Sequence, residues 1–83
     1  MIIVFILIIV RSGDENKVIE KLKGHPMVKE VYKVYGEYDM IVKIEAEDIN
    51  ELDDFRNKVL GKIREMVMSE TLIASSYGGG WDD

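Results

Sequence analysis

Four residues of this sequence have side-chain or backbone groups that together suit a small charged ligand. Gly36 is expected to free backbone N–H groups at a turn, and Asp39 offers a carboxylate three residues later. Ser69 and Thr71 add hydroxyl groups on one face of a later segment. An α-amino acid presents an ammonium, which needs a carboxylate or carbonyls, and a carboxylate, which needs N–H or O–H donors. The set therefore favours a zwitterionic ligand.

Asp39 has two interpretations. Aspartate is disfavoured within strands, so at the start of a strand its carboxylate needs solvent, a backbone donor or a ligand. One interpretation makes Asp39 the cap of a turn, and the other makes it the group that binds a ligand ammonium. As a surface turn carboxylate it would contribute little to stability, so we expect Asp39→Ala to keep the fold and to weaken binding.

Groups for catalysis or metal binding are scarce in this sequence. It contains no cysteine and a single histidine, His25, which lies between a glycine and a proline. The adjacent carboxylates Asp53-Asp54 and Asp82-Asp83 are typical of a solvated helix face and a charged tail. The sequence therefore predicts no catalytic residue, no metal site and no cofactor.

Length and composition predict one domain, at residues 1–76, followed by a flexible C-terminal tail at residues 77–83. With 11 Lys and Arg against 16 Asp and Glu, the net charge of −5 disfavours binding to nucleic acid. The lack of cysteine fits the cytoplasm.

Residues 1–10 are uncharged, but they are too few to span a membrane, which needs about 20 apolar residues. No basic region precedes them, so we predict neither a membrane segment nor a signal peptide.

Hydrophobic periodicity predicts six elements. Residues 1–10 read as a strand that is apolar on both faces, and Ser12 with Glu15 has the form of a capping box for a helix of about eleven residues. Asp48 repeats this capping pattern before a helix that reaches about Gly61. The other three elements are strands, expected at residues 28–35, 39–46 and 67–76.

This order, βαββαβ, predicts an α+β ferredoxin-like fold, with a four-stranded antiparallel sheet and both helices on one face. The first and third strands are central in that topology, which agrees with an apolar first strand. The second strand, with Lys and Glu among its apolar residues, is expected at an edge. Two helices cover only one face of the sheet, so a second subunit is expected to cover the face that carries Phe5 and Leu7.

The segment from Val34 to Lys43, which contains Gly36 and Asp39, resembles the G-x-x-D signature of the effector domain, called the RAM domain, in Lrp/AsnC-type regulators. The resemblance covers about residues 1–76 and includes Pro-Met-Val-Lys-Glu-Val-Tyr at 26–32 and Ser-Glu-Thr-Leu-Ile at 69–73. It implies dimers of the dimeric α/β-barrel kind, which often close into rings, commonly of eight chains. It also implies that amino acids bind between dimers, at a site lined by Gly36, Tyr38, Asp39, Ser69 and Thr71.

The usual regulators of this family place a helix-turn-helix domain before the effector domain, whereas this chain starts at the first strand. We therefore expect a stand-alone effector domain that does not bind DNA directly and that binds an amino acid or co-assembles with full-length regulators. The alternative is a small dimeric α/β-barrel enzyme, of the monooxygenase or isomerase kind. The shortage of acid and base residues favours the sensing module over the enzyme.

Overall fold

The computed structural model describes residues 1–74. Its elements, in chain order, are β1 (Ile2–Val10), α1 (Glu15–Leu22), β2 (Val28–Lys33), β3 (Met40–Ala46), α2 (Ile49–Lys58), the 3₁₀ helix η1 (Leu60–Lys62) and β4 (Met66–Ile73). The predicted tail at residues 77–83 and the Asp82-Asp83 pair lie outside the described residues, and the domain boundary at residue 76 stays a prediction.

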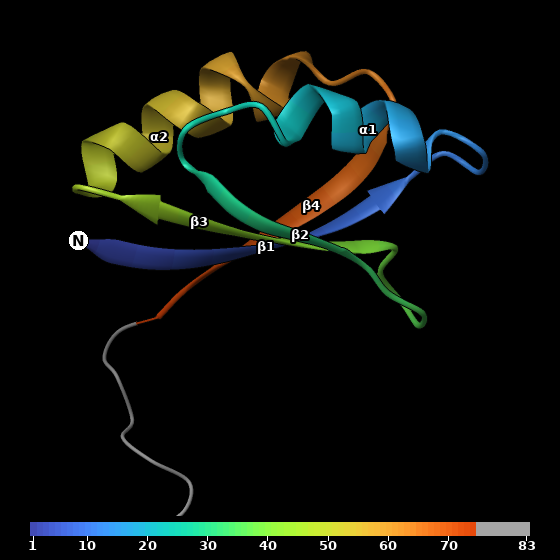
Figure 1. The fold of residues 1–83 in the computed structure, drawn as a ribbon, viewed down its shortest axis with the longest axis horizontal. Coiled ribbons are helices and arrows are strands. Elements are labelled where there is room, and N and C mark those ends of the chain that lie inside the picture. Colours follow the sequence, from blue (N-terminus) through green and yellow to red (C-terminus); the bar gives the residue numbers. More distant parts are fainter. Residues whose placement is uncertain (75–83) are drawn as a thin grey trace, which may run out of the picture.

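The four strands form one antiparallel sheet in the order β2-β3-β1-β4. Both α-helices lie on the same side of this sheet, which leaves its other side uncovered in the protomer (Figure 1). The ferredoxin-like βαββαβ fold is therefore confirmed, with β1 and β3 central and β2 at an edge as the sequence predicts.

The core forms between the helices and alternate residues of the central strands. On β1 the side chains of Val4, Ile6 and Ile8 are fully buried, whereas Ile3 and Phe5, on the other face, are 39% and 38% exposed. Side chains alternate between the faces of a strand, so an apolar run supplies both the core and the uncovered face. The two faces of β1 thus have different surroundings in one protomer.

One predicted helix start is wrong and the other is confirmed. Helix α1 begins at Glu15 after Asp14, whose side chain makes no capping bond. The predicted cap, Ser12, lies inside a turn that is closed by a hydrogen bond of 2.9 Å from the N–H of Asp14 to the carbonyl of Arg11. Ser12 therefore lies two residues before the N-cap position, which Asp14 occupies. At α2, Asp48 Oδ1 accepts the N–H of Glu51 at 2.9 Å, which is the predicted cap.

The helices are also shorter than expected. Helix α1 has eight residues, and α2 ends at Lys58, after which Gly61 lies within the short η1 helix. No helix within residues 1–74 is long and apolar enough to cross a membrane.

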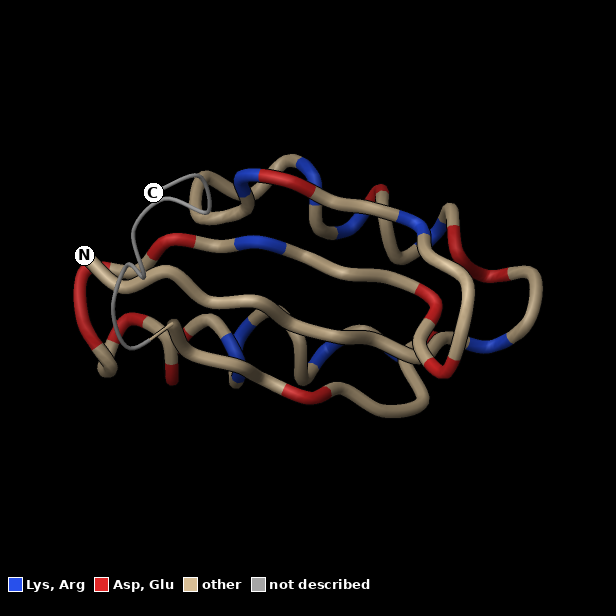
Figure 2. Tube along the Cα trace, turned by 90° about the horizontal axis from the view of Figure 1, so that it is seen from below, with Lys and Arg blue, Asp and Glu red and all other residues tan. Residues whose placement is uncertain are grey.

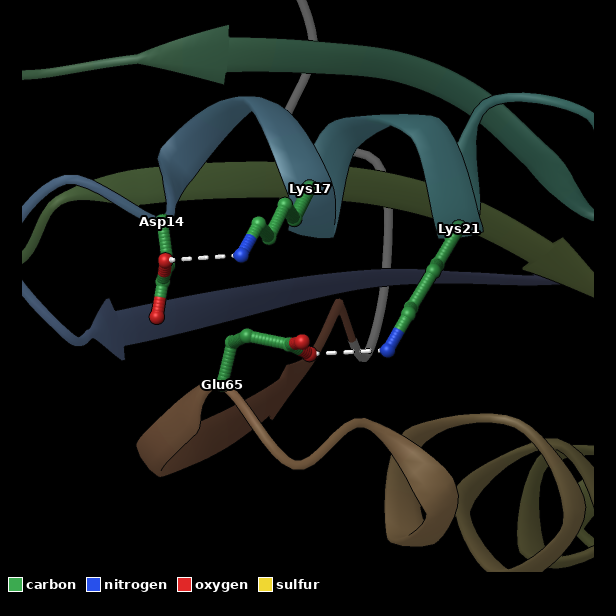
Figure 3. A network of polar contacts seen from close by, with 4 residues as sticks. All are labelled: Asp14, Lys17, Lys21 and Glu65. Atoms are coloured by element: carbon green, nitrogen blue, oxygen red, sulfur yellow. Dashed lines mark hydrogen bonds and ion pairs between the residues drawn. The ribbon is translucent and has the colours of Figure 1, made fainter.

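An ion pair connects α1 to the start of β4. Lys21 Nζ lies 2.8 Å from Glu65 Oε1 (Figure 3). The backbone N–H of Arg11 donates to the Glu65 carbonyl at 2.9 Å. The hydrogen bond from Lys21 is the main cause that lowers the pKa of Glu65 below its ordinary value of 4.5. Residues that are 44 positions apart in the sequence thus hold one helix end against the sheet.

Candidate functional site

The β2–β3 hairpin is more open than the sequence predicts. Strand β2 ends at Lys33 instead of residue 35, and β3 begins at Met40 instead of residue 39. Residues 34–39 connect the strands, and the N–H of Val34 donates to the carbonyl of Asp39 at 3.0 Å. Gly36 has a φ of +135°, a conformation that side-chain-bearing residues rarely adopt, so its predicted place in a turn is confirmed.

Asp39 ties this hairpin to the end of β1. Its Oδ2 accepts the backbone N–H of Val10 at 2.9 Å, and its own N–H donates to the carbonyl of Ile8 at 2.8 Å. Val10 is only 5% exposed, so its N–H has little access to water. The capping interpretation of Asp39 therefore holds for one carboxylate oxygen, and the expectation of a surface carboxylate with little structural role was wrong. Within residues 1–74 the other oxygen, Oδ1, has no hydrogen-bond or ion-pair partner.

A cavity of about 370 Å³ lies beside this hairpin. The residues that line it come from the first turn of α1, the end of β2 and the hairpin, namely Glu15, Lys33, Val34, Tyr35 and Asp39. The start of α1 and the hairpin lie at the same end of the sheet, which brings these segments together (Figure 1). Its volume is within the range of roughly 300–1,000 Å³ that is typical of ligand pockets.

The cavity contains two charged residues that sequence reasoning did not assign to a site. Glu15 is the first residue of α1, and Lys33 is the last residue of β2. Within the described part of the chain neither forms an ion pair. The sequence pattern explained Glu15 as part of a capping box and Lys33 as an edge-strand charge. Only their meeting at one end of the sheet marks them as candidates for binding.

Tyr38 is not among the residues that line this cavity, and its side chain reaches Glu70, which pairs with Leu7 on the uncovered face of the sheet. Its hydroxyl donates to Glu70 Oε1 on β4 at 2.5 Å. This hydrogen bond raises the pKa of Tyr38 above its ordinary value of 10.0, because ionisation would remove the donated proton and place a phenolate beside a carboxylate. Tyr38 therefore connects the hairpin to the opposite edge strand.

Ser69 and Thr71 lie on the other side of β1 from the hairpin. They pair with Ile8 and Ile6, whose side chains are in the core, so both hydroxyls are on the helix-facing side of β4. Ser69 lines a second cavity of about 310 Å³, which lies against α2 and includes Arg56.

The five residues predicted for the site thus occupy three places in one protomer. Gly36 and Asp39 are in the hairpin beside the first cavity, Tyr38 reaches across the uncovered face, and the two hydroxyl residues are near α2. Of the charged groups that line the first cavity, Asp39 offers a carboxylate and Lys33 offers an ammonium. The assignment of all five residues to one ligand stays a prediction.

His25 has a structural environment. Its Nδ1 accepts the N–H of Met27 at 3.1 Å, and its ring packs edge-on against Phe55 of α2, with 5.0 Å between the ring centroids. Within residues 1–74 no group of three or more His, Cys, Asp or Glu side chains is placed to hold a metal ion.

Comparison with known proteins identifies the relatives of this chain. The family described as the Lrp/AsnC ligand binding domain matches residues 3–77. The HTH-type transcriptional regulator FL11 of Pyrococcus furiosus is 40% identical over 72 residues, which are 87% of this chain and 47% of FL11. The chain therefore spans about half the length of this curated relative.

Solved structures agree with the fold. The crystal structure of FFRP-DM1 superposes with a TM-score of 0.85 at 46% identity and covers 89% of this chain and 99% of that one. The structure of AsnC from E. coli superposes with a TM-score of 0.88 at 28% identity, over 95% of this chain and 54% of AsnC.

One match is to an enzyme. Homocitrate synthase of Sulfurisphaera tokodaii is 45% identical over 47 residues, which are 57% of this chain but only 9% of the synthase. Because most of the synthase has no counterpart in this chain, the match gives little support to the enzyme interpretation. The longer match, to FL11, is to a regulator.

Proposed function

The chain belongs to the Lrp/AsnC ligand-binding domain family, and from this premise we propose that it senses an amino acid at the β2–β3 hairpin and assembles through its uncovered sheet face. The observation that supports sensing most directly is the hairpin cavity, which Asp39 and Lys33 both line. Within residues 1–74, Asp39 keeps one carboxylate oxygen there without a hydrogen-bond or ion-pair partner. These two charges match the ammonium and the carboxylate of a zwitterion. The backbone bonds of Asp39 position its carboxylate before any ligand arrives.

Asp39→Asn tests the binding role without removing the structural one. The amide oxygen can still accept the Val10 N–H, but the negative charge is lost. We expect titration calorimetry with a panel of free L-amino acids to show affinity weakened by about tenfold or more, as for a lost charged hydrogen bond. Glu37→Gln removes the same charge from the same hairpin, outside the cavity lining, and should leave affinity unchanged. Equal affinity in wild type and both variants would remove Asp39 from the site.

Assembly is supported by the apolar character of the uncovered face. We call this the open sheet face and define it by the exposed large side chains that lie on it: Ile3, Phe5, Tyr32, Met68 and Leu72. Seen from this side, the central strand β1 carries no charged residue along its length (Figure 2). Strands β3 and β4 add charged residues to this face, because Lys43 pairs with Phe5 and Glu70 pairs with Leu7. Large apolar side chains exposed along a central strand, with charges at their borders, mark a contact surface.

Sedimentation of Phe5→Glu tests the assembly. A charge at Phe5 would be buried without a partner in a dimer that uses the open sheet face, so we expect the variant to disperse to monomers or to lose its fold. Ile49→Glu is the matched control, because Ile49 is 48% exposed but lies on α2, on the other side of the sheet. Wild-type assembly in both variants would show that another surface forms the contact.

Full-length regulators are the partners that this function implies. We propose that the module acts in the cytoplasm, as amino-acid-loaded homo-oligomers, rings of eight among them, or as mixed assemblies with complete Lrp/AsnC regulators. The net charge of −5 supports the absence of direct DNA binding. In a mobility-shift assay at physiological salt the chain alone should not retard a duplex, and added to a complete regulator it should change that regulator's shift. A salt-sensitive complex of duplex and chain alone would contradict this partition of roles.

A further inference from the structure

We infer that the hairpin cavity selects an amino acid with a cationic side chain, and that Glu15 is the residue that determines this specificity. The inference rests on the proposed function, because it concerns the ligand of the same cavity. It goes further by assigning a role to a residue of α1 and by naming the chemical class of the effector.

The charges of the residues that line the cavity determine which ligand charges would complement it. The cavity has two carboxylates, Glu15 and Asp39, and one ammonium, Lys33. A ligand that neutralises all three needs two positive groups and one negative group. A neutral amino acid has one of each and would leave a carboxylate unpaired as the ligand displaced water from it, which is costly. An acidic amino acid would add a second negative charge. A basic amino acid complements the set, because it has an ammonium on the α-carbon, a second ammonium at the end of its side chain and one carboxylate.

The different positions of the two carboxylates assign their roles. Asp39 belongs to the hairpin and is committed through Oδ2 to Val10, so it is suited to the invariant α-ammonium of the ligand. Glu15 comes from a separate element and is half-buried. Its neighbour Asp14 lies 3.6 Å from Lys17, so that lysine is already paired with another carboxylate (Figure 3). Glu15 is therefore available to a second ammonium on the ligand side chain.

The wall between these charges suits an aliphatic stem. Val34 and Tyr35 line the cavity, and Tyr35 is fully exposed in the protomer. A ligand that lies along these side chains would cover apolar surface with its methylene groups, as lysine stems do on protein surfaces. An ammonium joined to the α-carbon by a methylene chain, as in lysine or ornithine, fits this lining.

The test compares L-lysine with L-norleucine, which has a nearly identical stem without the terminal ammonium. Titration calorimetry on the wild-type protein should give at least about tenfold tighter binding of L-lysine, and L-glutamate should bind more weakly than either. Glu15→Gln should bring L-lysine to the affinity of L-norleucine and should not weaken L-norleucine, because the substitution also removes the carboxylate that L-norleucine leaves unpaired. Asp39→Asn, by contrast, should weaken both. Glu20→Gln is the control, since it removes a charge from the exposed side of the same helix, where Glu20 pairs with Lys23.

A charge reversal adds a readout that does not depend on loss of binding. Glu15→Lys should make the protein prefer L-glutamate to L-lysine, with circular dichroism confirming that α1 is retained. Equal affinity of wild type for L-lysine and L-norleucine, tighter binding of L-glutamate, or equal weakening of both ligands by Glu15→Gln would overturn the inference and leave amino-acid sensing in place. No binding of any amino acid would refute the proposed function itself, and the inference with it.

Discussion

Replacing Asp39 with alanine should destabilise the fold, in addition to any effect on ligand binding. The carboxylate accepts the N–H of Val10 at 2.9 Å, at the position where β1 ends and the hairpin closes. Alanine removes the acceptor without replacing it. The N–H of a residue that is 5% exposed would then be left with little access to water.

The magnitude follows from that unsatisfied donor. Leaving a buried polar group without a partner costs about 1–3 kcal/mol. In a domain of this size each kcal/mol lowers the melting temperature by roughly 4–8 °C, so Asp39→Ala should melt at least about 4 °C below wild type. Asp39→Asn keeps an acceptor and loses only the charge. Asp39→Asn should therefore lose less stability than Asp39→Ala, because a neutral hydrogen bond still contributes about 0.5–1.5 kcal/mol.

Urea unfolding followed by circular dichroism measures these differences. All variants must be compared at one protein concentration, because assembly makes apparent stability concentration-dependent. Glu37→Ala is the control: it removes a carboxylate from the same hairpin, and as an exposed substitution it should stay within about 0.5 kcal/mol of wild type. If Asp39→Ala unfolds at the same midpoint as Glu37→Ala, the bond to Val10 does not stabilise the native state and the reasoning fails.

Three further predictions concern other elements. Lys21 lowers the pKa of Glu65 in the folded state, so the stability that this pair contributes is present above pH 4.5 and is lost as pH falls through the lower folded pKa. Glu65→Gln should therefore be less stable than wild type at pH 7. The difference in stability between the two proteins should narrow in acid titrations followed by fluorescence or circular dichroism. Asp48→Ala should lose about 0.5–2 kcal/mol in urea unfolding, because it removes the cap of α2, whereas an unchanged midpoint would show that the cap is dispensable. Ile6→Ala should lose about 2–5 kcal/mol, because its side chain is fully buried, and a loss no larger than that of Ile3→Ala would contradict the assignment of faces on β1.

The sequence by itself determined the elements and their topology. An uncharged run on both faces of β1 required a central strand, and apolar residues at period two on β3 required one buried face. Asp48 with Glu51 marked the start of α2 correctly, because a cap depends on neighbours three residues away. These features are local or periodic, so they can be read without knowing which segments meet. The G-x-x-D segment likewise located Gly36 in a turn and Asp39 beside it.

Only the tertiary structure decided which groups meet. The same capping pattern failed at Ser12, because a turn between Arg11 and Asp14 delayed the start of α1. Ser69 and Thr71 looked suitable by type, but pairing with β1 placed them on the helix-facing side of the far edge strand, away from Asp39.

The charged cavity was also decided by contacts between distant segments. Glu15 begins α1, whereas Lys33 and Asp39 belong to the β2–β3 hairpin, at least 18 residues further along the chain. No local pattern links them. They come together because antiparallel pairing of β1 with β3 sets the hairpin against the end of β1, and a short turn leads from there to α1. That register depends on which strand faces are buried in the core rather than on the residues of the site.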